Sequence, residues 1–276
     1  MGRREQRITE LSNPRTEGID RLAADEIVQR ILAEDALVPA AVAEARDQIT
    51  EASNILFEAL AAGGRWFNLG AGTSGRIGVL DAAEIPPTFG LPAGRVQAVM
   101  AGGARALSRA VEGAEDDAEA AAWELRERGL EGGDAVLAVS ASGWTPFTLG
   151  ALEAAHEVGA RRLALSCDPR SPLAEGAEIA IVPEVGPEVI AGSTRMKGGL
   201  AQKAVLNMLS SAVMVKLGYV SGNLMTHLSP ASEKLRRRAE WIVMELAGVG
   251  RQEASRLLEE TEGDAHLAVE RALRRE

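Results

Sequence analysis

Three short stretches of the chain combine glycine with hydroxyl side chains, a composition suited to binding phosphate. They are GAGTSG at 70–75, SASGWT at 140–145 and GSTRMK at 192–197. Glycine leaves backbone N–H groups accessible, and N–H groups at the start of a helix attract anions. One such stretch alone is more simply explained as a helix N-cap, but three on one chain predict a phosphate site. The candidate ligand residues are Gly72, Thr73, Ser74, Ser140, Ser142, Gly143, Thr145, Ser193, Thr194 and Lys197.

Two glutamates, Glu84 and Glu115, are candidate acid–base residues. Glu84 lies in DAAEIPPTFG, where we expect a helix to end because two prolines direct the chain out of it. Glu115 lies in AVEGAEDD. Two carboxylates that face one sugar can act as general acid and general base, each contributing about 10²–10⁴-fold. One of them must then have its pKa raised by burial or by the other's charge. The alternative for the acidic stretch is a solvated surface, which we expect for Glu112, Asp116, Asp117 and Glu119.

The glycines at 70, 72 and 75 also match G-x-G-x-x-G, the fingerprint of a dinucleotide-binding turn. That fingerprint requires an acidic residue about 20 residues later, at the end of the next strand, to bind the ribose. The corresponding strand here ends in Ala101-Gly102-Gly103. A smaller phosphate ligand therefore fits the stretch better than a dinucleotide.

Metal and acyl-enzyme chemistry find no support in the spacing of the reactive residues. The histidines, His156, His227 and His266, are scattered and share no metal-ligand spacing with Cys167. No serine lies in a G-x-S-x-G nucleophile elbow. We therefore expect neither a metal nor a cofactor.

The elements that must position these residues alternate apolar runs with amphipathic segments. Strands are expected within 65–72, 95–103, 134–143, 161–169 and 177–186, and helices at 20–62, from 72 to about 83, mostly over 104–129, and at 145–159 and 198–218. This alternation predicts an α/β fold with a doubly wound, five-stranded parallel sheet. Ligands of such sheets lie beyond the carboxyl ends of the strands, where 72–75 and 140–145 fall.

From about residue 237 the pattern becomes purely helical, with breaks at Gly248-Val249-Gly250 and Gly263-Asp264. We predict a main domain at 1–236, with helices at its N-terminus, and a small all-helical C-terminal domain at 237–276. The alternative is that the last helices pack onto the main domain.

Composition narrows the class of partner. A net charge of −10 and a pI near 5.0 argue against a nucleic-acid surface, and no apolar run approaches the ~20 residues needed to cross a membrane. The single cysteine fits a reducing cytoplasm, and the charged start of the chain is not followed by the apolar stretch of a signal peptide. We therefore expect a cytoplasmic protein. The helices at 20–62 and 198–218 carry more apolar surface than one sheet face requires, so we also expect a homodimer.

Several of these stretches together resemble one enzyme family. LGAGTSGRIGVLDAAEIPPTFG, AVEGAEDD, SASGWTPF, GSTRMKGGLAQKAVLNMLS and the opening LSNPRTEGID are similar to the N-acetylmuramic acid 6-phosphate etherases, from about Thr9 to the end of the chain. The resemblance implies a sugar-isomerase-type (SIS), flavodoxin-like catalytic domain and a C-terminal domain resembling a ubiquitin-associated fold. It extends to the regulatory protein of glucokinase, which binds sugar phosphates without turning them over.

The resemblance implies a lyase of cell-wall amino-sugar recycling. It would cleave the D-lactyl ether of N-acetylmuramic acid 6-phosphate, by elimination and hydration, to N-acetylglucosamine 6-phosphate and D-lactate. By the family motif Glu84 matches the proton donor to lactate, and Glu115 matches the second carboxylate, a candidate base at C2. Trp144 stands where the family's SGRTP leads us to expect arginine, and Arg76 or Arg195 could compensate. A non-catalytic sugar-phosphate regulator and a phosphosugar isomerase are the alternatives.

Overall fold

A five-stranded parallel sheet forms the centre of the computed structural model, which describes residues 7–227 and 233–274. Its strands are β1 (Trp66–Gly70), β2 (Val96–Met100), β3 (Ala135–Val139), β4 (Arg161–Leu165) and β5 (Ile179–Ile181). The order β2-β1-β3-β4-β5 is the flavodoxin-like one, and each neighbouring pair is parallel. The predicted doubly wound sheet is confirmed.

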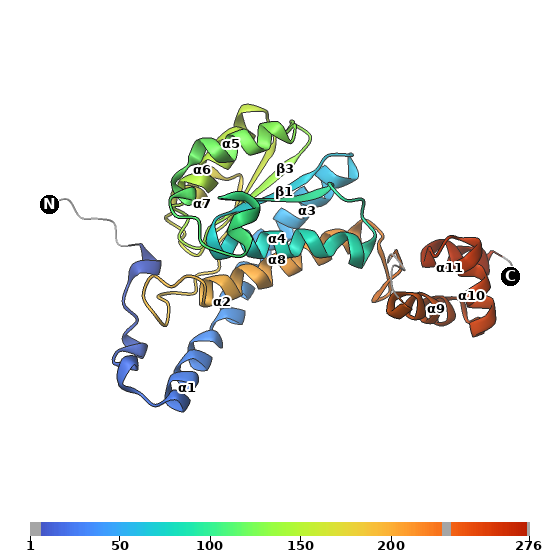
Figure 1. Ribbon diagram of the computed structural model, residues 1–276, viewed down its shortest axis with the longest axis horizontal. Helices are drawn as coiled ribbons and strands as arrows, with labels where there is room; N and C mark the ends of the chain where they lie inside the picture. Colours follow the sequence, from blue (N-terminus) through green and yellow to red (C-terminus); the bar gives the residue numbers. More distant parts are fainter. Residues whose placement is uncertain (1–6, 228–232, 275–276) are drawn as a thin grey trace.

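Helices cover both faces of the sheet (Figure 1). One face packs against α3 (Arg46–Ala61), α4 (Gly72–Phe89) and α8 (Lys197–Lys216); the other packs against α5 (Ala118–Glu127), α6 (Pro146–Glu157) and α7 (Pro172–Gly176). Successive strand side chains alternate between the two cores, as Trp66 and Phe67 do in β1. Burial on both faces explains why the strands are continuously apolar.

The N-terminal region is more broken than the single helical stretch predicted for 20–62. Short 3₁₀ turns at Ile8–Glu10, Pro14–Thr16 and Ile19–Arg21 precede α1 (Ala24–Asp35) and α2 (Val38–Glu44). Pro39 lies in the first turn of α2, where its missing N–H costs nothing. The same missing N–H could not have bonded Asp35 in an uninterrupted helix, so α1 ends there.

Helix α4 continues past the prolines, so the expectation that a helix ends at Glu84 is wrong. Pro86 and Pro87 lie inside α4, which ends only at Phe89. Gly90 caps it in the left-handed conformation and donates its N–H to the Pro86 carbonyl at 2.9 Å. Because the two prolines have no backbone N–H, two hydrogen bonds are lost in the last turns of α4. Packing of α4 against the sheet and α8 offsets this loss.

The segment predicted as mostly helical at 104–129 forms a regular α-helix only at its end. A 3₁₀ helix at Gly103–Leu107 and a 3₁₀ turn at Ala114–Asp116 precede α5. Gly102 and Gly113 cap these pieces with positive φ, and the Asp117 carboxylate accepts the Ala120 N–H at the start of α5. The irregular crossing from β2 to α5 carries Glu115.

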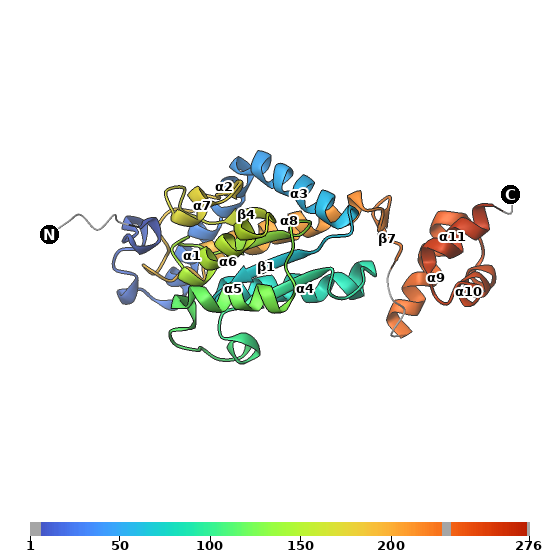
Figure 2. The same cartoon turned by 90° about the horizontal axis from the view of Figure 1, so that it is seen from above.

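The C-terminal residues form three helices beside the main body (Figure 2). They are α9 (Glu233–Ala247), α10 (Arg251–Glu260) and α11 (Ala265–Leu273), separated where the sequence predicts breaks. Their shared core includes Ile242, Val243 and Leu257. They contact the small hairpin formed by β6 (Val220–Ser221) and β7 (Leu224–Met225), next to which His227 stacks on His266 with ring centroids 4.4 Å apart.

Asp81 is a buried carboxylate between α4 and α8. Its Oδ1 accepts the Ser210 hydroxyl at 3.0 Å, and its Oδ2 is buried without a partner among the described residues. Burial raises the pKa of Asp81 to about 6 from 3.8, against the opposing bond from Ser210. The stability that this group contributes is therefore fully present below pH 3.8 and is lost as the pH rises through 6.

We expect Asp81→Asn to raise the free energy of unfolding at pH 8 by about 2 kcal/mol, because it removes a buried charge and keeps an acceptor for Ser210. Urea unfolding at several pH values measures this, and the pH dependence between about 4 and 7 flattens in the variant. Asp47→Asn, at an exposed site on α3, is the matched control and changes stability by less than about 0.5 kcal/mol. Equal unfolding curves for Asp81→Asn and the wild type at pH 8 would contradict the prediction.

Candidate active site

A cleft of about 470 Å³ opens at the carboxyl ends of β1 and β3. These strands are neighbours, and the chain order of the sheet reverses between them, which is where open α/β sheets bind ligands. The residues that line the cleft are Arg7, Glu10, Ala71, Gly72, Thr73, Ser74, Glu115, Asp116, Val139, Ser140, Ala141, Ser142, Trp144, Thr145, Pro146, Gly192 and Thr194. The structure thus brings most of the predicted ligand residues together.

The first glycine stretch presents the N-terminus of α4 to the cleft. The first intrahelical bond is donated by Gly75 to the Ala71 carbonyl at 3.1 Å, so the N–H groups of the preceding turn are not used within the helix. Ala71 supplies no side-chain cap. Gly70 and Gly75 serve close packing of strand on helix, because a Cβ on Gly75 would lie 2.5 Å from the Gly70 oxygen. An open helix N-terminus favours an anion here.

The second stretch, 140–145, forms a turn stabilised by its own hydroxyls. Ser140 Oγ accepts the Gly143 N–H at 3.1 Å and is 2.9 Å from the Thr145 hydroxyl. Ser142 Oγ accepts the Trp144 N–H at 3.3 Å. Gly143 has φ +70°, and a Cβ there would lie 2.2 Å from Ser171 Oγ, so glycine is required. The turn leads into α6, whose Thr145 N-cap forms no side-chain cap bond.

The third stretch has a different role from the first two. The buried Glu188 carboxylate accepts the N–H groups of Lys197 and Gly198, each at 2.9 Å, and so occupies the N-terminus of α8. The Lys197 ammonium is fully buried and donates to Glu34 Oε2 at 2.7 Å. Thr194 lines the cleft, but Ser193 and Lys197 do not. The anion-binding groups at the start of α8 are therefore already satisfied by carboxylates of the chain itself.

The two candidate acid–base residues are far apart within one chain. Glu115 lies on the rim of the cleft, in the 3₁₀ turn before α5. Glu84 is exposed and lies twelve residues after Gly72 in the same helix, which is about 18 Å along the axis at about 1.5 Å per residue. It is not among the residues that line the cleft.

The cleft also contains residues that the sequence patterns do not point to, namely Arg7, Glu10 and Asp116. For Asp116 the sequence predicts a solvated surface, and no local signal marks the other two. Arg7 lies over Trp144, with its guanidinium carbon 4.9 Å from the ring centroid. Neither cation considered as a replacement for arginine at 144 lines the cleft. Arg76 donates to the Leu107 carbonyl at 3.2 Å, and Arg195 is exposed.

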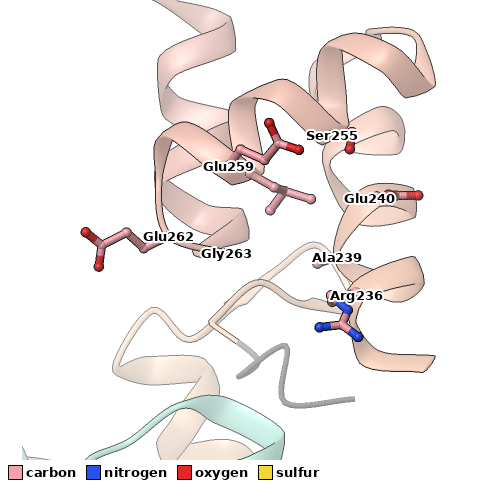
Figure 3. A pocket seen from close by; sticks show the side chains of 8 residues that line it. Arg236, Ala239, Glu240, Ser255, Glu259, Glu262 and Gly263 are labelled. Atoms are coloured by element: carbon pink, nitrogen blue, oxygen red, sulfur yellow. The ribbon is translucent and has the colours of Figure 1, made fainter. Parts of the chain in front are cut away.

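A second cavity, of about 340 Å³, lies between α9 and α10 (Figure 3). Carboxylates dominate its lining, with Glu240, Glu259 and Glu262 against the one guanidinium of Arg236. Glu240 and Glu262 point away from each other, and Glu240 pairs with Arg251 at 3.0 Å. These charges suit a phosphate less well than the cleft at β1 and β3.

Within residues 7–227 and 233–274, no group of three or more His, Cys, Asp or Glu side chains is arranged to hold a metal ion. No helix in the same ranges combines the length and apolarity needed to cross a membrane.

Structural comparison supports the fold alone. A phosphoheptose isomerase from Francisella tularensis matches 70% of this chain and 100% of its own, with a TM-score of 0.57 and 18% identity. A phosphoheptose isomerase from Neisseria gonorrhoeae matches 68% of this chain and 98% of its own, with a TM-score of 0.50 and 19% identity. Residues 48–156 match the family model of the glucokinase regulatory protein N-terminal SIS domain.

Sequence comparison extends over nearly the whole chain. An N-acetylmuramic acid 6-phosphate etherase from Brucella anthropi is 49% identical over 262 residues, which cover 95% of this chain and 85% of the relative. Enzymes of the same name from Pectobacterium atrosepticum and Salmonella typhi are 48% and 46% identical, over 95% and 96% of this chain and 86% and 90% of their own lengths. The chain therefore belongs to the N-acetylmuramic acid 6-phosphate etherase family.

Proposed function

We propose that this enzyme cleaves the lactyl ether of N-acetylmuramic acid 6-phosphate in the cleft between β1 and β3. The observation that carries the proposal is the composition of that cleft. Two helix N-termini without side-chain caps and a set of hydroxyls converge there, with the Glu115 carboxylate on the rim. Such a cleft combines anion binding with a group that can move a proton.

The phosphate position is proposed to be the turn at 140–145. Its hydroxyls come from Ser140, Ser142 and Thr145, and α6 begins at the same point. The start of α8 is a poorer candidate, because Glu188 accepts its N–H groups. The α4 N-terminus, with Thr73 and Ser74, remains available for the other polar groups of the sugar.

The chemistry needs a base and an acid. In the open-chain sugar the C1 aldehyde acidifies the C2 proton, which a carboxylate removes. The electron pair forms the C2=C3 double bond, and the C3–O bond breaks with its pair going to the lactate oxygen, which takes a proton from the acid. Water then adds across the double bond, with its oxygen at C3. We propose Glu115 as the base and Glu84 as the acid.

Glu84 reaches such a site only if it comes from another copy of the chain. It shares the exposed face of α4 with Leu80, one helical turn earlier, which is 45% exposed. On the adjacent α8, the apolar residues Leu200, Met208 and Val215 are exposed at intervals of about two turns. We propose that this face forms a homodimer in which Glu84 of one copy completes the cleft of the other. These apolar side chains are exposed in the single chain, and exposed apolar side chains that share a face are typical of a surface that binds a partner.

The domain boundary and the cellular location are also proposals. We propose that residues 1–236 form the catalytic domain and 237–276 a separate helical domain, with α9 starting slightly before that boundary. A cytoplasmic location is proposed because the sequence has a single cysteine and so cannot form an intrachain disulfide, as is usual for proteins of a reducing compartment.

The direct test is turnover of N-acetylmuramic acid 6-phosphate in H₂¹⁸O, followed by mass spectrometry. Release of unlabelled lactate together with N-acetylglucosamine 6-phosphate carrying ¹⁸O at C3 is the expected result. Bound substrate that is recovered unchanged would instead support a non-catalytic sugar-phosphate regulator. Aldose–ketose conversion without lactate would support an isomerase.

A further inference from the structure

The charged side chains that line the cleft include three carboxylates and one cation that could bind an anionic substrate. Glu10, Glu115 and Asp116 contribute carboxylates to the lining. Among the described residues that line the cleft, Arg7 is the one basic side chain. The proposed substrate carries two anionic groups, a phosphate and a carboxylate, and helix N-termini supply only partial charges. A full positive charge in the cleft is therefore significant.

The main chain around Arg7 is attached to the domain by several contacts. The Ile8 N–H donates to Asp168 Oδ2 at 3.4 Å, and the Thr9 carbonyl accepts the Gly192 N–H at 2.9 Å. Further along, Thr16 donates its hydroxyl to the Val189 carbonyl at 2.8 Å. The segment that carries Arg7 thus runs along 187–192, whose last residue, Gly192, lines the cleft, and Arg7 has a defined place there.

Asn13 and Glu34 extend this attachment. The Asn13 amide donates to Glu34 Oε2 at 2.8 Å and to the Pro187 carbonyl at 3.2 Å. Arg15 and Lys197 also donate to Glu34, at 2.9 and 2.7 Å. The buried lysine of the third stretch therefore helps to position the N-terminal segment rather than the substrate.

The indole of Trp144 supports the Arg7 guanidinium, 4.9 Å away. Tryptophan is the strongest aromatic partner for such a cation–π contact. A guanidinium that lies over a ring can still direct its N–H groups, which lie in its own plane, at a phosphate or carboxylate. The Trp144 Nε1 is buried without a hydrogen-bond partner among the described residues.

We propose that Arg7, held on Trp144, is the cation that binds an anionic oxygen pair of the substrate. The identity of the sugar rests on the proposed function, whereas the binding of an anionic group by Arg7 does not. The positive charge expected at position 144 from the family resemblance is thus supplied from position 7, and Trp144 is the platform for it.

Calorimetric binding of two probes separates the possible anions. N-acetylglucosamine 6-phosphate carries only the phosphate, and N-acetylmuramic acid carries only the carboxylate. We expect Arg7→Gln to raise the Kd of one of them by about 10- to 100-fold, the value for a lost charge-assisted hydrogen bond. The probe that is affected identifies the group. Arg7→Lys, which keeps the charge without the planar fork, gives an intermediate Kd.

Two further variants test the platform and the specificity of the effect. Trp144→Leu is expected to raise the same Kd by about 2- to 5-fold, and Trp144→Phe by less, because it retains a ring. Arg21→Gln is the matched control, since Arg21 is an exposed arginine of the same segment, 85% exposed, that does not line the cleft. With N-acetylmuramic acid 6-phosphate, Arg7→Gln raises KM and changes kcat by less than about threefold.

The outcomes separate this proposal from the etherase activity. Kd values for Arg7→Gln that match those of Arg21→Gln with both probes would refute the role of Arg7. Normal probe binding by the wild type, weakened by Arg7→Gln but without lactate release, would uphold Arg7 and refute the activity. A wild-type protein that binds neither probe would contradict the anion-binding role of Arg7, whereas the activity is decided by lactate release alone.

Discussion

Glu115→Gln is expected to lower the rate of lactate release by about 10²–10⁴-fold, because glutamine cannot remove the C2 proton. The change is isosteric and lies in an exposed 3₁₀ turn, so the fold and the KM for substrate should be little affected. Single-turnover measurement of lactate checks the rate. Glu112→Gln, three residues away and also exposed but outside the cleft, is the control and should retain full activity.

Mixing two inactive variants decides where the second carboxylate comes from. Glu84→Gln and Glu115→Gln homodimers should each be inactive. When equal amounts are dissociated and reassociated, about half of the dimers are mixed, and one of their two sites has both glutamates if Glu84 acts across the interface. About a quarter of wild-type activity should therefore return. If both carboxylates act within one chain, no activity returns, and the shared-site proposal is wrong.

The second large effect is expected for Lys197→Met, which should lower the free energy of unfolding at pH 7 by about 3 kcal/mol. Removing one partner of a buried ion pair leaves the other charge under-compensated. Glu34 keeps its bonds from Arg15 and Asn13, so the loss should lie at the low end for such a change. Urea unfolding gives the value. Lys216→Met, at the exposed end of the same helix, should cost less than about 1 kcal/mol.

Two further readouts of Lys197→Met bear on its role. Among folded molecules the KM for substrate should stay within about threefold of wild type, whereas a direct phosphate contact predicts a rise of at least about tenfold. A raised KM with an unchanged unfolding curve would contradict the structural role.

The hydrogen bond from Arg15, with smaller contributions from Lys197 and Asn13, lowers the pKa of Glu34 to about 2 from 4.5 despite its burial. Its contribution is present above pH 4.5 and lost as the pH falls toward 2.

The parts of this protein that follow from local chemistry could be predicted from its sequence. Continuous apolar runs alternating with amphipathic segments determine the parallel sheet, because both faces of each strand must be buried. The turns at 72–75 and 140–145 then follow two neighbouring strands, so their meeting at one edge is a consequence of the topology. The motifs that carry the family resemblance also lie within short stretches.

Other features were decided only by tertiary structure, because they depend on partners distant in the chain. Lys197 is committed to Glu34, 163 residues away, and Glu188 fills the start of α8. No local pattern distinguishes a lysine paired in this way from one that binds phosphate. Likewise, tertiary packing keeps α4 helical past Pro86 and Pro87, and Glu84 lies on the exposed face of this helix. Arg7 reaches Trp144 because the N-terminal segment folds back along 187–192. Sequence determined the elements and the reactive groups, whereas long-range contacts decided which of those groups remain free to meet a substrate.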